Sequence, residues 1–141
     1  MSSGAEVFGR LVLDTSAYSH LRRGHEGVLD HLARAELIVV PVIVLGELEA
    51  GFVLGERSRE NSFLLSQFLA EPFVTVRDLT PSVSRHYARV FGQLRRKGRP
   101  IPINDVWIAA ATLDCGGHLL TLDENFALVE GLDCTILSPV E

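Results

Sequence analysis

The chain has 141 residues and a formal net charge of −5, with 47% hydrophobic and 22% charged residues. This length suits one domain with a sizeable core, so we expect a single domain over residues 1–141. The composition is typical of a soluble globular protein, and no apolar run is long enough to cross a membrane, since Pro41 interrupts the longest one. The negative charge disfavours a protein that binds nucleic acid through a generally basic surface.

Two further features indicate the compartment. Residues 1–9 lack a basic start followed by an apolar block, so we expect a loose N-terminal segment and no secretory signal there. The two cysteines, Cys115 and Cys134, fit neither a zinc site nor a disulfide framework. We expect reduced core cysteines in a cytoplasmic protein, although the sequence also permits one disulfide.

In the first half of the chain, short apolar runs alternate with helical stripes. The run Leu11-Val12-Leu13 predicts a buried strand that stops on Asp14, and the hydroxyls that follow can cap a helix. A pair of amphipathic helices later in this half can form a helical hairpin. In chain order, we expect a strand over 10–14, helices over 15–23 and 26–34, a strand over 37–40, and helices over 41–54 and 58–69.

The second half continues the alternation and contains one strongly marked helix. Thr80-Pro81 is a typical helix start, and basic residues followed by Gly98 mark the end of the same helix. Strands that alternate with helices predict an α/β fold with a parallel sheet covered on both faces. In chain order, we expect a strand over 73–76, a helix over 81–97, a loop over 99–104, a helix over 105–115, a strand over 118–122, a helical turn near Phe126 and a strand over 134–137.

Four carboxylates occupy places that can converge in such a fold. Asp14 and Asp123 end apolar strands, Glu47 lies about two turns into a helix, and Asp105 opens a helix. At about 5 Å and an effective dielectric near 20, two like charges repel by roughly 3 kcal/mol. A hard divalent cation such as Mg²⁺ or Mn²⁺ relieves that repulsion. Singly, each acid also fits a helix cap, a turn or a solvated face, and Glu49 competes with Glu47.

The segments around these acids resemble a known family. They are Leu13-Asp14-Thr15-Ser16, Gly46-Glu47-Leu48-Glu49-Ala50-Gly51, Ile103-Asn104-Asp105-Val106-Trp107-Ile108-Ala109-Ala110 and Leu119-Leu120-Thr121-Leu122-Asp123-Glu124-Asn125-Phe126. Their order and contexts resemble those of the PIN-domain ribonucleases, specifically the VapC-type toxins of bacterial toxin–antitoxin pairs. The resemblance implies a three-layer α/β/α sandwich with a mainly parallel central sheet and a helical hairpin.

The resemblance also implies a role for each matched residue. Asp14, Glu47, Asp105 and Asp123 would be catalytic and would hold Mg²⁺ or Mn²⁺, and the spacing to Gly51 selects Glu47 over Glu49. Supporting hydrogen bonds would come from Thr15, Ser16, Asn104 and Thr121. The implied activity is metal-dependent hydrolysis of RNA phosphodiester bonds, and the implied partners are an antitoxin protein and a second copy of the chain.

Because the chain is acidic, RNA must be attracted by local basic groups, for which the candidates are Arg95, Arg96, Lys97 and Arg99. The same cluster also fits a solvated helix end. Two other functions stay open: a PIN-like module that binds RNA or protein without cleaving, and a receiver-like signalling domain. The receiver-like hypothesis requires a lysine near the sheet edge, whereas the only lysine is Lys97. The chain has no Gly-x-Ser-x-Gly elbow and no phosphate-binding glycine loop.

Overall fold

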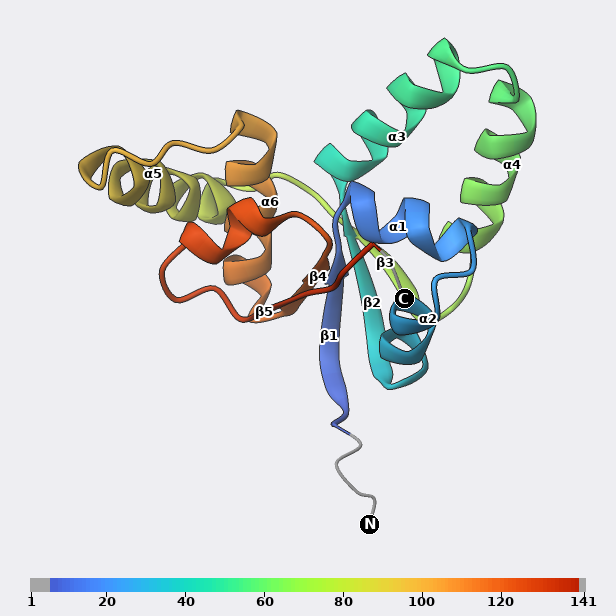
Figure 1. The fold of residues 1–141 in the computed structure, drawn as a ribbon, viewed down its shortest axis with the longest axis horizontal. Helices are drawn as coiled ribbons and strands as arrows, with labels where there is room; N and C mark the ends of the chain where they lie inside the picture. The colour runs from blue at the N-terminus through green and yellow to red at the C-terminus, as the bar shows by residue number, and fades with distance from the viewer. Residues whose placement is uncertain (1–5, 140–141) are drawn as a thin grey trace.

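A computed structural model describes residues 6–139 and shows a five-stranded parallel sheet with helices on both faces (Figure 1). The strand order is β3-β2-β1-β4-β5. The predicted α/β/α fold with a parallel central sheet is therefore confirmed. The strands are β1 (Phe8–Leu13), β2 (Ala35–Pro41), β3 (Val74–Arg77), β4 (His118–Thr121) and β5 (Cys134–Ile136).

The helices alternate with the strands along the chain. They are α1 (Thr15–Arg22), α2 (Glu26–Ala33), α3 (Val42–Leu54), α4 (Ser58–Leu69), α5 (Pro81–Arg96) and α6 (Ile103–Cys115), with a short 3₁₀ helix η1 (Glu124–Leu128). Three of them begin at side-chain caps that the sequence predicts or permits: Asp14 accepts from the Ala17 N–H, Thr80 from the Val83 N–H, and Asp123 from the Asn125 N–H. These caps satisfy backbone donors that would otherwise lack a partner.

The topology has a reversal beside the central strand β1. From β1 the chain moves through β2 to β3 at one edge, then returns to place β4 on the other side of β1. In open parallel sheets, ligands bind at such a reversal, just beyond the carboxyl ends of the strands. Asp14 follows β1 and Asp123 lies two residues beyond β4, so both acids lie at the reversal.

The core explains why the strands are almost wholly apolar. Leu11, Val12 and Leu13 of β1 are fully buried, as are Leu119 and Leu120 of β4. Parallel strands covered on both faces lose the alternation of apolar and polar residues for this reason. Burial on both sides also fixes the register, since Leu13 pairs with Leu120 and thereby brings the ends of the two strands together.

Several predicted boundaries are wrong by a few residues. Phe8 and Gly9 belong to β1 and not to a loose N-terminal segment, whereas residues 1–5 lie outside the described range. Pro41 ends β2 and precedes α3 instead of opening the helix. The most consequential shift is at α6, which begins at Ile103, because the Pro102 carbonyl accepts the N–H groups of Asp105 and Val106. Asn104 therefore lies in the first turn of a helix and not in a loop.

The helical hairpin is confirmed. Helices α3 and α4 pack side by side and project beyond the end of the sheet (Figure 1), and Ser62 Oγ of α4 donates to Glu49 Oε1 of α3 at 2.7 Å. Both cysteines are free, as expected. Between residues 6 and 139, no helix combines the length and the apolar character that a membrane span requires.

Candidate functional site

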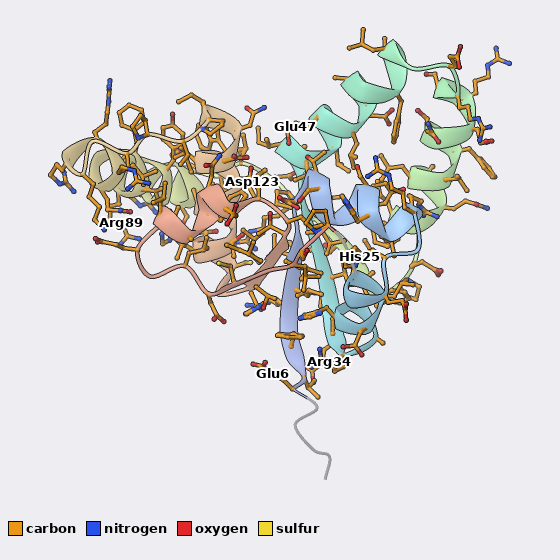
Figure 2. The ribbon with its side chains drawn as sticks, in the orientation of Figure 1. Glu6, His25, Arg34, Glu47, Arg89 and Asp123 are labelled. Carbon is orange, nitrogen blue, oxygen red and sulfur yellow. The ribbon has the colours of Figure 1, made fainter. Side chains whose placement is uncertain are left out.

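The four predicted acids converge at the carboxyl ends of β1 and β4. They come from four segments: the β1–α1 junction, the second turn of α3, the first turn of α6 and the β4–η1 junction. Figure 2 shows Glu47 and Asp123 on the same side of the molecule, beside the end of β1. The charge of each of the other three acids raises the pKa of Asp105, so all four share one electrostatic environment.

Asp14 is buried and held by hydroxyl and amide donors. Its Oδ1 accepts from Ser16 Oγ at 2.7 Å and from the Ala17 N–H at 2.8 Å, and its Oδ2 accepts from Thr121 Oγ1. No basic side chain is among these partners. Burial is the largest influence on the pKa of Asp14 and raises it, although the three hydrogen bonds oppose the shift.

Ser16 and Thr121 also connect β1 to the β4–η1 junction. Ser16 Oγ accepts from the Leu122 N–H at 3.0 Å, and Thr121 Oγ1 accepts from the Asp123 N–H at 2.9 Å. The same two hydroxyls that donate to Asp14 therefore orient the backbone that carries Asp123. This is the supporting geometry that the sequence analysis predicts for both residues.

Glu47 is oriented from two directions. Thr15 Oγ1 donates to Glu47 Oε1 at 2.5 Å, and Asn104 Nδ2 donates to Glu47 Oε2 at 3.1 Å. Thus α1 and α6 both position a carboxylate that belongs to α3. The competing acid Glu49 is exposed and accepts from Ser62 instead. The structure therefore places Glu47, and not Glu49, with the other three acids.

Asp105 has the most perturbed pKa of the site, raised to about 7. Partial burial is the largest cause, followed by the charges of Asp123, Glu47 and Asp14 and by a hydrogen bond with Asp123. An acid whose pKa lies near neutrality is either protonated or strained by its neighbours when no cation is present. The raised pKa of Asp105 thus indicates that the four acids are close together without enough positive charge to offset them.

The donor set fits a hard divalent cation. It consists of carboxylate oxygens supplemented by hydroxyl and amide oxygens, the ligand types that Mg²⁺ and Mn²⁺ prefer. Within residues 6–139, no three Asp, Glu, His or Cys side chains are arranged as a ready-made metal cage. Glu47 and Asp14 are instead positioned by hydrogen bonds that they accept from hydroxyl, amide and backbone donors.

The structure does not bring the four predicted basic residues together with the acids. They follow Leu94 at the carboxyl end of α5, which lies at the edge of the molecule in Figure 1. Lys97 is paired with Glu130 at 2.6 Å, and Arg95 lies over the Phe91 ring. Of the four, Arg95 is linked to the helix that carries Asp105, because it lines a small apolar pocket together with Ile103 in the first turn of α6.

Gln93, which no sequence motif marks, joins α5 to the end of η1. Its Nε2 donates to the Leu128 carbonyl at 3.1 Å, and its Oε1 accepts from the Glu130 N–H at 3.2 Å. Asp123 caps the other end of the same short helix η1. A lone glutamine on an amphipathic helix gives no signal for such a contact.

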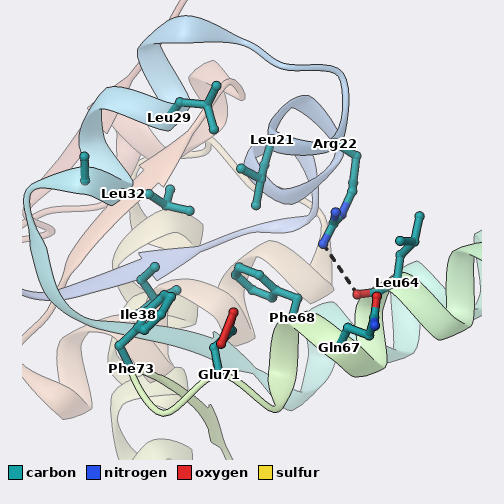
Figure 3. A pocket seen from close by; sticks show the side chains of 11 residues that line it. Leu21, Arg22, Leu29, Leu32, Ile38, Leu64, Gln67, Phe68, Glu71 and Phe73 are labelled. Carbon is teal, nitrogen blue, oxygen red and sulfur yellow. Dashed lines mark hydrogen bonds between the residues drawn. The ribbon is translucent and has the colours of Figure 1, made fainter.

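A large apolar groove lies away from the acids. Its volume is about 590 Å³, and it lies between α1, α2 and α4 above the start of β3 (Figure 3). The lining is mostly leucine and phenylalanine, and Arg22 crosses it to donate to the Leu64 carbonyl. None of the four acids lines this groove.

Comparisons with known proteins agree with this architecture. Ribonuclease VapC5 of Mycobacterium tuberculosis is 27% identical over 120 residues, which are 85% of this chain and 87% of that protein. Ribonuclease VapC4 of the same organism is 32% identical over 95 residues, 67% of this chain and 72% of that protein. Among solved structures, the VapBC2 complex of Rickettsia felis bound to promoter DNA contains a chain with a TM-score of 0.81 and 21% identity, covering 92% of this chain and 99% of that one. At that identity, the likeness shows the fold.

A family model describes most of the chain. The model of the PIN domain matches residues 11–132, a range that contains all four acids, the second half of β1 and the whole of β2, β3 and β4. The resemblance in the sequence motifs, the parallel sheet with its reversal at β1, and the curated relatives all point to the same family. The chain belongs to the PIN domain family.

Proposed function

We propose that the protein is an endoribonuclease that depends on Mg²⁺ or Mn²⁺ and hydrolyses RNA phosphodiester bonds as the toxin of a toxin–antitoxin pair. The observation that carries this proposal is the convergence of Asp14, Glu47, Asp105 and Asp123 without a basic partner. The ribonuclease names of the curated relatives support the reaction class. We place its action in the cytoplasm, where RNA substrates are found.

The proposed mechanism assigns distinct tasks to the side chains. Asp14, Glu47, Asp105 and Asp123 would hold the ion, and the ion, when bound, offsets the charge that develops on the phosphate. Ser16 and Thr121 orient Asp14 and the Asp123 backbone, and Thr15 and Asn104 orient Glu47. Burial and the charges of Asp123, Glu47 and Asp14 raise the pKa of Asp105 to about 7, and a divalent ion held there would offset these charges.

A cleavage assay with Asp14→Asn tests the proposal. The substitution keeps the shape of the side chain but removes its charge, so we expect cleavage of RNA to fall by about a hundredfold or more. The wild type should cleave with Mn²⁺ and not with EDTA. A matched control is Glu49→Gln, which removes a carboxylate from the same helix as Glu47 but outside the site. Equal cleavage by wild type and Asp14→Asn, or full activity in EDTA, would contradict the proposal.

A non-catalytic PIN-like module remains the alternative. It predicts RNA or protein binding with no cleavage product under any metal condition. The complete set of four acids favours the enzyme, because a binding module has no need to hold four carboxylates together against their repulsion.

We further propose that a cognate antitoxin covers the apolar groove of Figure 3. Similar folds occur in VapBC complexes from Rickettsia felis and Mycobacterium tuberculosis. The groove is large, and Leu29 and Phe73 on its rim expose apolar side chains to solvent. Co-expression with the neighbouring open reading frame, followed by copurification, tests this. Leu29→Glu should abolish copurification but leave RNA cleavage unchanged, because no acid of the site lines the groove.

A homodimer is the remaining partner that we propose. The outer end of the α3–α4 hairpin exposes large apolar side chains, namely Val53, Leu54 and Phe63. Leu54 is 89% exposed. A second copy that covers this end would remove them from water. Light scattering of wild type and Leu54→Glu measures the effect, and a monomeric wild type would exclude the dimer.

A further inference from the structure

Basic charge is concentrated in one segment of this acidic protein. Residues 79–104 contain six of the 13 basic residues and none of the 18 acidic ones. Nearly all of this segment is α5 and the loop that follows it. The rest of the chain therefore has a much larger net negative charge than the total of −5 suggests. A polyanion that approaches the protein would be attracted to α5 and repelled elsewhere.

Three arginines of this segment share one face of the helix. Arg85, Arg89 and Arg96 follow the helical repeat together with Gly92, so all four positions lie along one line on α5. We call this surface the α5 arginine face. The Arg96 guanidinium folds back over Gly92, since a Cβ atom at Gly92 would lie 3.1 Å from Arg96 Nη1. The glycine thus leaves room for this guanidinium against the helix.

Among residues 6–139, the arginines of this face have no acidic partner. Elsewhere, Arg34 pairs with Asp30, Arg57 with Glu60 and Arg77 with Asp114. Within the part of the chain that the structure describes, Arg85, Arg89 and Arg96 form no ion pair, and Arg89 donates only to His86. Their charge is therefore available to a ligand.

A groove lies between this face and the residues that follow η1. It has a volume of about 370 Å³, and Arg89 and Arg96 line it opposite Glu130 and Gly131, which follow η1. Gln93 holds the far end of η1 against α5, and Asp123 caps the near end. Figure 2 shows Arg89 and Asp123 on the same side of the molecule, with η1 between them. Through Gln93 and η1, the helix that carries these arginines is therefore joined to the segment that Asp123 begins.

We propose that the α5 arginine face and the groove beside η1 bind the phosphate backbone of RNA on one side of the cleavage site. This inference rests on the proposed ribonuclease function and names the surface that holds the substrate. The acids at the site repel phosphates, so attraction must come from a neighbouring surface with the opposite charge. Unpaired guanidiniums spaced along a helix supply that attraction without reading the bases.

The test measures binding and its salt dependence. Arg89→Gln/Arg96→Gln is compared with Arg23→Gln/Arg59→Gln, which removes the same charge from two exposed arginines on other helices or their ends. Both pairs are made in the Asp14→Asn background, and a labelled single-stranded oligouridylate of about twelve nucleotides is titrated at several KCl concentrations with Mg²⁺ held constant. We expect the first pair to lower the affinity at low salt by about tenfold and the salt slope by about 1.4. The control pair should change neither by much.

A second readout separates this inference from the proposed function. In the active protein, Arg89→Gln/Arg96→Gln should raise KM with kcat within about twofold of wild type, because these residues lie away from the reacting phosphate. If wild type cleaves and the two pairs behave alike in affinity and KM, the inference fails while the proposed function stands. If wild type never cleaves but the first pair alone loses affinity, the proposed function fails while RNA binding by this face is supported.

Discussion

Asp14 and Asp114 are two poorly exposed aspartates with opposite electrostatics. Asp14 is 4% exposed and the Asp114 side chain 6%. Asp114 accepts hydrogen bonds from Ser82 and Arg77, and these bonds hold its pKa below the usual value. Asp14 has only neutral donors, and burial raises its pKa.

The difference between the two separates structural acids from acids kept for a ligand. Asp114 joins α6 to Arg77 at the end of β3 and to the start of α5, with His86 Nε2 at 3.6 Å, so its charge is neutralised within the fold. Asp14 belongs to a group of four acids without any such cation. Under the proposed function, a divalent ion from solution would supply the missing charge.

The largest expected effect comes from Asp105→Asn, because the substitution should change both RNA cleavage and the stability of the metal-free protein. Removing the charge should lower RNA cleavage by about a hundredfold or more, since a ligand of the ion is lost. The same change should raise the metal-free stability at neutral pH, because it relieves the repulsion from the other three acids. Cleavage assays and urea denaturation in EDTA measure the two effects. A variant that loses stability together with activity would show that Asp105 has a structural role.

Asp114→Asn should lower the stability of the protein and leave RNA cleavage unchanged. Arg77 would lose its charged partner, and we expect a loss of about 1–3 kcal/mol in the free energy of unfolding. Cleavage at temperatures well below the Tm should be unchanged. A matched control is Asp30→Asn, which removes an exposed ion pair with Arg34 and should cost no more than about 1 kcal/mol. If Asp114→Asn and Asp30→Asn proved equally mild, the structural half of the comparison would be lost.

The two kinds of acid should also give opposite pH profiles. The pKa of Asp105 is raised to about 7, so the folded state binds this proton more tightly and stability falls as pH rises from the unfolded value toward 7. The pKa of Asp114 is lowered, so its contribution is full above the unfolded value and is lost as pH falls through the folded value. In EDTA, the stability of Asp105→Asn should therefore exceed that of wild type only as pH rises. Millimolar Mn²⁺ should close that gap by raising the Tm of wild type, and parallel profiles with and without Mn²⁺ would exclude a shared cation site.

The smallest expected effect is a change in stability from a substitution at Gly92 in the α5 arginine face, outside the acidic site. Gly92 is helical, and a Cβ there would meet only the flexible end of Arg96. Gly92→Ala should therefore stabilise the protein by about 0.5–1 kcal/mol in denaturant titration. A loss of stability would show that the guanidinium of Arg96 is held rigidly against the helix.

The elements that the sequence predicted well are those with strong local signals. The helix over 81–97 has a cap, a proline and a terminal glycine, and α5 matches it closely. The errors at the starts of α3 and α6 both lie beside a proline. Pro41 and Pro102 each precede the first helical residue with extended backbone, whereas the usual preference of proline for the first helical position predicted Pro41 inside the helix. The four acids were identified from their contexts and not from their contacts.

By itself, the chain determined the alternation of strands and helices, the buried character of β1 and the identity of the four acids, because these depend on local patterns of polarity and on short motifs. Only the tertiary structure decided that Thr15 and Asn104 both donate to Glu47 and that Gln93 joins α5 to η1. These contacts join residues far apart in the chain, and the order of strands around β1 brings them together. The strand order depends on which helices cover each face of the sheet, and no local pattern in the sequence determines it.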